Sequence, residues 1–147
     1  MKKYSKEMNV DKFLIYSIIK VESNFKEKSI SRSGAKGLMQ IMNATAKECA
    51  NKVGIKIVLP DDLFSADLNI RLGTFYIKNL LKKYNDNLPI ALAAYNAGIG
   101  NVNSWFGKDI GNINFNKIIN RVRFFQTKTY IKKVIFYYKK YKNIYKE

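Results

Sequence analysis

Residues 21–25 read VESNF, and after a serine-rich loop the chain continues as GAKGLMQIM at residues 34–42. Just before the first segment, apolar residues recur three and four positions apart: Leu14, Ile15, Ile18 and Ile19. This spacing predicts an amphipathic helix from Val10 to Ser23. Glu22 lies four residues after Ile18, so it extends the apolar face of that helix. The pattern therefore predicts one carboxyl group in a place that water reaches poorly.

The predicted setting of Glu22 favours its protonated form. Burial penalises a carboxylate, and the C-terminal end of a helix disfavours negative charge. Both effects raise the pKa of the side chain above the ordinary glutamate value of about 4.3. A carboxyl group that keeps its proton near neutral pH can donate it to a leaving oxygen, so Glu22 is a candidate general acid.

A search for a second catalytic carboxylate finds no comparable candidate. Paired carboxylates are the usual apparatus for cleaving glycosides. No other acidic residue lies in a stretch as rich in glycine, amide and aromatic residues as the region around Glu22. Spacing leaves a distant partner open but favours a lone carboxylate. One carboxyl group suffices where the substrate supplies its own nucleophile, as in substrate-assisted glycosidases.

The rest of the chain has a helical pattern with weak strand signals. Further helices are predicted at Gly37–Val53, Ala66–Tyr84, Asn87–Asn96, Val102–Phe106, Asn116–Val122 and Thr127–Tyr145. Asn87 is expected to cap its helix with Pro89 in the first turn, and Gly98 and Gly100 are expected to break that helix. The segment Asn51–Leu59 is expected to be irregular or extended. We expect residues 1–147 to form a single all-α domain.

Composition removes several kinds of chemistry. The chain has 147 residues, no histidine and one cysteine, Cys49. These counts exclude an internal disulfide, Ser-His and Cys-His catalysis and most zinc sites. Acid–base chemistry then falls to Asp, Glu, Lys or Tyr. Cys49 lies beside Ala46 and Ala50 on a predicted helix, so we interpret it as a buried core residue rather than a nucleophile.

The chain is strongly basic. Its formal net charge is +16, from 27 Lys and Arg against 11 Asp and Glu. This excess favours polyanionic partners such as nucleic acid, an anionic membrane or an acidic cell wall. No apolar run reaches the roughly 18 residues of a membrane-spanning helix. Lys2, Lys3 and Lys6 resemble the head of a signal peptide, but no adequate apolar segment follows, so we expect a leader or anchor to be absent from this sequence.

Four motifs follow one another along the chain in a characteristic order. The first joins IKVESNF at residues 19–25, Ser31 and the GAKGLMQIM segment to ATA at residues 44–46. The others are NIRLGTFY at residues 69–76, ALAAYNAG at residues 91–98 and FQTKTYI at residues 125–131. Together they resemble the soluble-lytic-transglycosylase-type (SLT) family. The resemblance covers about residues 10–141, and the order of its four motifs makes it specific.

The resemblance implies a lysozyme-like helical fold with a substrate cleft. It also implies cleavage of the β-1,4 bond between N-acetylmuramic acid and N-acetylglucosamine in peptidoglycan, with a 1,6-anhydro ring on the product. It implies no metal or other cofactor. Glu22 matches the general acid/base of the family, which protonates the leaving oxygen and then accepts a proton from the C6 hydroxyl as that oxygen closes on C1.

Five further positions match residues that line the cleft in this family. Ser31 matches a loop serine near the catalytic sugar, and Gln40 and Met42 match residues of the cleft floor. Tyr95 matches the cleft tyrosine, whose hydroxyl is suited to hold the catalytic carboxyl or the acetyl group of the substrate. Asn96 is expected to shape the turn beside it.

The fourth motif departs from the family pattern. The family usually has Glu-Thr-Arg where this chain has Gln126, Thr127 and Lys128. The family glutamate helps to order the cleft and can contact substrate. Gln126 keeps its size and hydrogen bonding but loses its charge, which puts the strength of substrate binding, and the activity itself, in doubt. Lys128 keeps the positive charge of Arg without its planar fork.

Two other functions remain open at this point. A goose-type lysozyme-like muramidase would use a related fold but admit water to C1. A basic helical module that binds nucleic acid or a membrane surface would account for the net charge. We expect peptidoglycan glycan strands as the partner, anionic wall polymers or a membrane surface as further partners, and no specific nucleic acid. We also expect a monomer that works in the cell envelope or another extracytoplasmic place.

Overall fold

The computed structural model describes residues 1–56 and 59–146. These residues form eight α-helices and one short 3-10 helix, η1. In chain order the elements are α1 (Lys2–Met8), α2 (Lys12–Ser23), α3 (Asn43–Lys52), η1 (Pro60–Phe64), α4 (Ala66–Lys83), α5 (Leu88–Ala97), α6 (Ile99–Phe106), α7 (Phe115–Arg121) and α8 (Phe125–Ile144). Within the described ranges the β-type pairing consists of two isolated bridges that share Lys36. The predicted all-α class is therefore confirmed.

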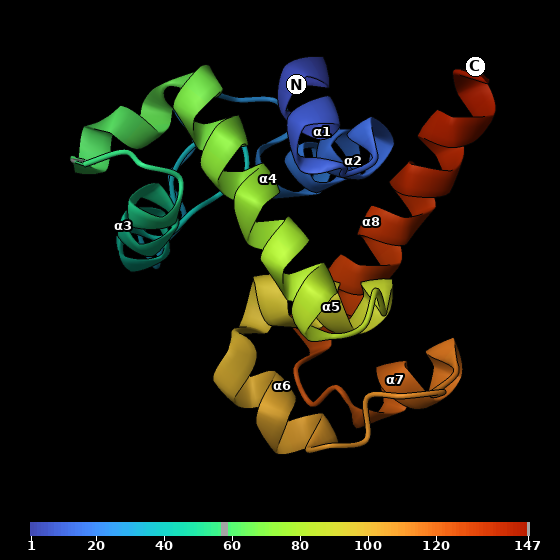
Figure 1. Cartoon of the computed structure of the whole chain (residues 1–147). Helices are drawn as coiled ribbons and strands as arrows, with labels where there is room; N and C mark the ends of the chain where they lie inside the picture. Colours follow the sequence, from blue (N-terminus) through green and yellow to red (C-terminus); the bar gives the residue numbers. More distant parts are fainter. Residues whose placement is uncertain (57–58, 147) are drawn as a thin grey trace.

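Helix α5 is largely buried and contacts α4, α6, α7 and α8. Residues 90–94 of α5 are all fully buried, as expected of a helix that is apolar on every side. Figure 1 shows α4 running across the molecule, with α1 and α2 at one end and α6 and α7 at the other. The longest helix, α8, packs most extensively on α2 and also contacts α5. The end of α2 is thus held between the core and α8.

The ends of α5 follow the predicted cap chemistry. The side chain of Asn87 accepts a hydrogen bond from the backbone N–H of Ile90 at 3.1 Å, and Pro89 lies in the first turn. Gly98 ends the helix with φ of +89°, a conformation that favours glycine. Gly100, by contrast, lies inside α6, so the prediction that it breaks a helix is wrong.

The second predicted helix starts six residues too early. Helix α3 begins at Asn43 rather than Gly37, and residues 37–42 form a turn instead. Gly37 has φ of +79° and Gln40 has φ of +50°, and neither angle belongs to a right-handed helix. The reason lies in the buried side chain of Asn69, which binds the backbone of this turn from α4.

Three further points concern the first half of the chain. Helix α1 was not predicted, and its Tyr4 is buried with its hydroxyl donating to Asp67 at 2.7 Å. Cys49 is buried, as predicted, and burial raises the pKa of its thiol to about 11, which leaves it unreactive at neutral pH. Part of the predicted irregular segment Asn51–Leu59, residues 57 and 58, lies outside the described residues.

Candidate active site

One cavity of about 630 Å³ brings the predicted site residues together. Its wall is built from the end of α2, the loop before α3, the end of α5 and the start of α8. All seven predicted positions line it: Glu22, Ser31, Gln40, Met42, Tyr95, Asn96 and Gln126. A neighbouring hollow of about 300 Å³ shares part of this lining and extends it toward Tyr76 and Gly98.

Glu22 lies one residue before the end of α2 and is the acid of this cavity. Among the described residues that line the cavity, it is the only carboxylate, and Arg32 is the only cation. Burial raises the pKa of Glu22 to about 7, against a smaller lowering effect from the hydroxyl of Tyr130. The predicted direction of this shift is confirmed. Glu22 therefore keeps its proton to a higher pH than an ordinary glutamate does.

Tyr130 belongs to the fourth motif, but the sequence analysis did not place it in the site. It lies on the buried face of α8, only 5% exposed, and its hydroxyl interacts with Glu22. Within the described part of the chain this hydroxyl reaches no partner in good hydrogen-bond geometry. Burial first, and then the negative charge of Glu22, raise the pKa of Tyr130 well above its usual value. Tyr130 is thus a neutral phenol whose dipole acts on Glu22.

Tyr95 has a different contact from the one expected. Its hydroxyl donates a hydrogen bond of 2.7 Å to the backbone carbonyl of Met39, and a phenol has only one proton to give. The hydroxyl therefore has no proton left to donate to Glu22 or to the acetyl group of the substrate, the two partners expected for it. Glu22 is still close enough that its charge, after burial, raises the pKa of Tyr95. The ring of Tyr95 packs on that of Tyr76, with centroids 5.3 Å apart.

Side chains of the first motif hold the loop against α2. The hydroxyl of Ser23 donates to the carbonyl of Leu38 at 2.7 Å, which joins the end of α2 to the turn. The hydroxyl of Ser31 accepts from the backbone N–H of Ala35 at 3.0 Å and lies 3.0 Å from that of Ser33. The loop that carries Ser31 into the cavity is therefore closed by its own hydrogen bonds.

Asn69 of the second motif fixes the backbone of the first. Its buried amide accepts from the N–H of Met39 at 2.7 Å and donates to the carbonyls of Lys36 and Leu63 at 2.9 and 2.8 Å. A Cβ atom at Gly37 would overlap the amide of Asn69, so only glycine fits at this crossing. The requirement for these residues is geometric, because they place the cavity floor rather than touch it.

Gln40 and Asn96 are committed partly to the scaffold. The amide nitrogen of Gln40 donates to the carbonyls of Ser29 and Gly37 at 3.1 and 2.9 Å, which leaves its oxygen as the polar atom for the cavity. Asn96 accepts a hydrogen bond of 2.8 Å from the hydroxyl of Thr127. This bond ties the end of α5 to the start of α8, next to Gln126.

Aromatic and basic residues outside the predictions complete the rim. Phe124 lines the cavity, is 47% exposed, and meets Trp105 edge to face with ring centroids 5.1 Å apart. Arg32 lies in the loop beside Ser31 and is exposed. Neither residue belongs to an apolar periodicity or to one of the four motifs, so no signal in the sequence pointed to the cavity.

Two further properties concern residues 1–56 and 59–146. Among them no group of three or more acidic or cysteine side chains is placed to hold a metal ion. In the same ranges no helix has both the length and the apolar character needed to cross a bilayer.

Comparison with known proteins gives consistent relatives. Residues 1–118 match the family described as Transglycosylase SLT domain. The soluble lytic murein transglycosylase of Salmonella typhimurium is 32% identical over 136 residues, which are 92% of this chain and 21% of that protein. The chain thus spans about a fifth of the length of the curated relatives it matches.

Solved structures are similar over almost all of the chain. An inactive mutant of the lytic transglycosylase Slt from Pseudomonas aeruginosa superposes with a TM-score of 0.88 at 35% identity, over 96% of this chain and 23% of that one. The 70-kDa soluble lytic transglycosylase of Escherichia coli gives a TM-score of 0.89 at 31% identity, over 97% of this chain and 23% of that one. These likenesses confirm the predicted lysozyme-like helical fold.

Proposed function

This chain belongs to the transglycosylase SLT domain family, and from that premise we propose that it is a peptidoglycan lytic transglycosylase. The bond cleaved is the β-1,4 link between N-acetylmuramic acid and N-acetylglucosamine, and the product carries a 1,6-anhydromuramic end. The observation that carries this proposal is a single carboxyl group, Glu22, with its pKa raised to about 7 in a cavity of about 630 Å³.

In the first step Glu22 acts as the general acid. Its proton passes to the glycosidic oxygen as the bond to C1 breaks, and the N-acetyl oxygen of the muramic acid bonds to C1 in its place. Glu22 is left as a carboxylate. In the second step this carboxylate accepts the proton of the C6 hydroxyl while O6 bonds to C1 and displaces the N-acetyl oxygen. One proton leaves Glu22 and one returns, so no water is consumed and no cofactor is needed.

The raised pKa of Glu22 suits both halves of this cycle. An acid with a pKa far below the working pH would already have lost its proton, and one far above it would be a weak donor. At a pKa of about 7 the same oxygen can give a proton in one step and recover one in the next. Burial raises the pKa of Glu22 to this value, and the hydroxyl of Tyr130 keeps the pKa from rising further.

The lack of a second carboxylate in the lining favours a lyase over a hydrolase. Glycosidases that direct water or an enzymic nucleophile to C1 place a second carboxyl roughly 5 to 9.5 Å from the acid. Among the described residues around the cavity, Glu22 has no such companion. The goose-type muramidase alternative is therefore less well supported, because the described lining holds no second carboxylate to direct water to C1.

The remaining lining residues are assigned to substrate binding. Ser31 and the free oxygen of Gln40 supply hydrogen bonds to the sugar that carries the scissile bond, and Met42, which is 42% exposed, supplies an apolar surface. Tyr95 acts through the turn, because its hydroxyl fixes the carbonyl of Met39. Asn96 and Gln126 form the opposite wall. Arg32 is placed to meet the carboxylates of the peptide stems on muramic acid.

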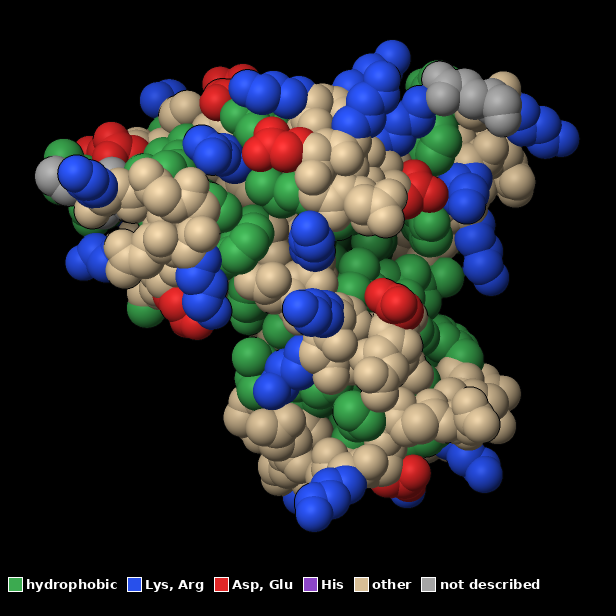
Figure 2. Space-filling model, in the orientation of Figure 1, with side chains coloured by type: hydrophobic (Ala, Val, Ile, Leu, Met, Phe, Trp, Pro, Cys, Tyr) green, Lys and Arg blue, Asp and Glu red, His purple; other side chains and the backbone are tan. Residues whose placement is uncertain are grey.

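Several properties of the whole protein follow as part of the same proposal. Residues 1–147 act as one catalytic domain, since their buried side chains form one core. The enzyme acts as a monomer on glycan strands in the cell envelope, outside the cytoplasm, where murein is found. Figure 2 shows Lys and Arg side chains spread widely over the visible face, which fits a polymer that carries many carboxylates.

Product analysis tests this function. Purified murein is digested with the protein, and the released muropeptides are measured by mass spectrometry. Products that lack one water relative to a muramidase digest are expected, and Glu22→Gln should release none. Fully hydrated reducing ends would instead assign the chain to the muramidases. No release by the wild-type chain would leave the site without its proposed activity.

A further inference from the structure

A second pocket lies on the opposite side of α2 from Glu22. It has a volume of about 480 Å³ and shares no residue with the Glu22 cavity. Its lining is five aromatic and two basic side chains: Lys2, Lys12, Phe13, Tyr16, Phe25, Tyr141 and Tyr145. Phe13 precedes Glu22 by nine residues, or two and a half helical turns, so the two side chains point in opposite directions. We call this hollow the aromatic pocket.

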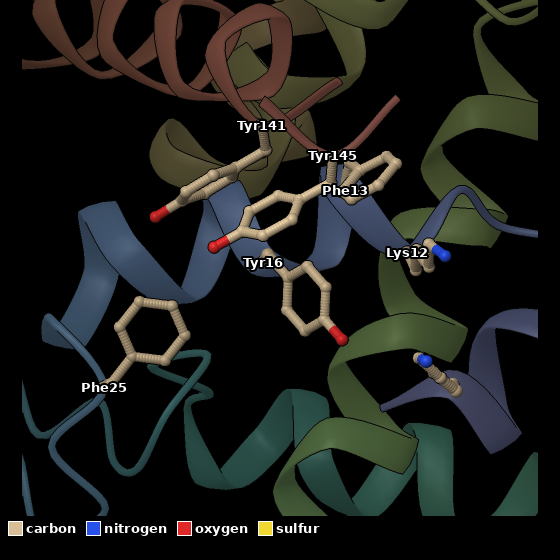
Figure 3. A pocket seen from close by; sticks show the side chains of 7 residues that line it. Lys12, Phe13, Tyr16, Phe25, Tyr141 and Tyr145 are labelled. Atoms are coloured by element: carbon tan, nitrogen blue, oxygen red, sulfur yellow. The ribbon is translucent and has the colours of Figure 1, made fainter. Parts of the chain in front are cut away.

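The rings line the hollow and leave much of their surface uncovered. Phe13 of α2 and Tyr145, just beyond α8, are nearly parallel at 11° with centroids 6.2 Å apart. Tyr16 and Tyr141 meet edge to face at 82° and 6.5 Å. Tyr145 is 58% exposed and Phe25 is 44% exposed. Figure 3 shows these side chains converging from α2, from the turn after it and from the end of α8.

The backbone brings Phe25 to this pocket in an unusual conformation. Asn24 and Phe25 both have positive φ, at 50° and 63°, a region that bulky residues rarely occupy. The turn thereby directs an exposed aromatic ring to the side of α2 away from the active site. Strained residues of this kind persist where surrounding structure holds them, and they cluster at binding sites.

The polar groups of the aromatic pocket are phenol hydroxyls and lysine side chains. The hydroxyls of Tyr16, Tyr141 and Tyr145 make no hydrogen bond with the described residues, so they are available to a ligand. Lys2 brings a positive charge to the pocket, and the described lining contains no carboxylate. The pocket therefore offers apolar ring faces, phenol hydroxyls and positive charge.

We propose that the aromatic pocket is a second saccharide site, which holds a carboxylate-bearing glycan strand while another part of the polymer occupies the Glu22 cavity. The identification of that strand as peptidoglycan rests on the proposed function. A pyranose ring has a C–H face that packs on aromatic rings and an edge of hydroxyls that reaches phenols. The volume falls within the roughly 300 to 1,000 Å³ of small-ligand sites. The net charge of +16 selects an acidic polymer over a neutral one.

A bilayer fits this surface less well than a glycan. Aromatic and basic residues also gather at membrane interfaces, but there the rings project outward to enter the lipid. In the aromatic pocket the rings face into a hollow that a flat surface cannot fill. Phe136, an aromatic residue on α8 that is 59% exposed, lies outside the pocket.

A second site raises the local concentration of saccharide units at the Glu22 cavity. A strand held behind α2 keeps neighbouring saccharide units near the Glu22 cavity and makes their binding effectively intramolecular. The gain applies to a long or insoluble polymer and vanishes for a fragment too short to reach both sites. Loss of the aromatic pocket should therefore weaken action on whole murein sacculi and spare action on short soluble fragments.

Binding is measured first, without turnover. Two variants are sedimented with purified murein sacculi. One carries Glu22→Gln alone, which leaves the polymer intact, and the other carries Tyr141→Ala and Tyr145→Ala in addition. The double change should weaken binding about tenfold, because it removes two stacking rings. Phe136→Ala is the matched control and should change binding less than twofold. Chitin, a neutral polymer of N-acetylglucosamine, should bind several times more weakly than murein.

Activity is measured second, with Glu22 in place. The same two tyrosine changes should slow release from sacculi and leave the rate on soluble tetrasaccharide fragments unchanged. A pocket variant that loses murein binding while the wild-type chain shows no cleavage would support the second site and refute only the proposed activity. Circular dichroism melting checks the fold, and Tyr145→Ala alone, beyond the end of α8, decides the matter if the double variant unfolds.

Unchanged murein binding in the folded tyrosine variants would overturn the proposal. Two parallel measurements identify what else the pocket holds in that case. Loss of sedimentation with vesicles of anionic and zwitterionic phospholipid would assign it to a membrane surface. Loss of self-association in analytical ultracentrifugation would assign it to a second copy of the chain. Equal binding to chitin and murein would overturn the preference for an acidic strand.

Discussion

The hydroxyl of Tyr130 on α8 interacts with the carboxyl of Glu22 on α2, and it lowers a pKa that burial raises. The two residues are more than a hundred positions apart in sequence and meet because α8 packs lengthwise on α2. The phenol has no other partner among the described residues, so its dipole is available to whichever protonation state Glu22 adopts.

Replacing Tyr130 by Phe should raise the pKa of Glu22 further. The change removes the one side-chain contact that lowers it and leaves the burial that raises it. The alkaline limb of the kcat/KM profile should therefore move to higher pH, which a purely structural role would not produce. Tyr137→Phe, a change on the same helix away from the cavity, should leave the profile in place. An unshifted limb in Tyr130→Phe would remove this residue from the site.

Tyr95→Phe should behave differently, because its hydroxyl binds the carbonyl of Met39 and not Glu22. Loss of that bond should lower the free energy of unfolding by about 1 kcal/mol. It should also slow turnover, since the turn that carries Gln40 and Met42 loses an anchor. The pH at which activity falls should stay where it is. Urea unfolding and a pH–rate profile check both parts, and a shift like that expected for Tyr130→Phe would mean that Tyr95 contacts Glu22 directly.

Asn69→Ala should be among the most destabilising polar changes in the chain. It removes three hydrogen bonds to the backbone and leaves buried donors and acceptors unpaired, at a cost of about 3 kcal/mol or more. Asn79→Ala, at a half-buried position of the same helix, should cost less than about 0.5 kcal/mol. Urea unfolding measures both, and similar small losses would show that the turn does not depend on this amide.

The stability of Glu22→Gln should depend on pH in a defined direction. The folded pKa of about 7 lies above the unfolded value, so the folded chain holds the proton more tightly, and the stability that Glu22 contributes is lost as pH rises toward 7. By pH 8 an ionised Glu22 costs about 3 kcal/mol that a glutamine does not. The variant should gain stability over the wild type between pH 5 and pH 8. Glu22→Gln should show no such trend if the carboxyl of Glu22 is solvated.

Gln126→Glu introduces the acid that the resemblance to the SLT family implies for the fourth motif. Gln126 is exposed at the rim of the cavity, so the added charge is screened by solvent and should disturb Glu22 little. Turnover of murein should be preserved or raised through a lower KM. A large loss of kcat would show that this chain requires the amide itself.

The sequence was sufficient to predict Glu22 as the candidate acid and α2 as the helix that carries it, because both predictions depend on local periodicity. Leu14, Ile15, Ile18 and Ile19 are buried as their spacing predicted, and Glu22 continues that face into the cavity. The four motifs also located every predicted lining position. Their roles in catalysis stay predictions until the variants are measured.

The failures share a physical cause, which is control from far along the chain. Residues 37–42 have the composition of a helix start, yet the side chain of Asn69 holds them in a turn. Tyr130 lies on the buried face of α8, and only the packing of α8 on α2 brings its hydroxyl to Glu22. The aromatic pocket likewise depends on the packing of α8 on α2, since Tyr141 and Tyr145 complete a lining to which α2 contributes Phe13.

The ionisation of Glu22 itself is the most direct measure of whether a buried carboxyl group acts as the general acid. The chain is labelled with glutamate enriched in carbon-13 at the carboxyl, and the signal missing from Glu22→Gln identifies the residue. Its chemical shift should titrate with a midpoint near pH 7, following a pKa of about 7, well above the ordinary glutamate value of about 4.3. A midpoint near 4.3 for Glu22 would contradict the account, because the proposed acid would have no proton to give at neutral pH.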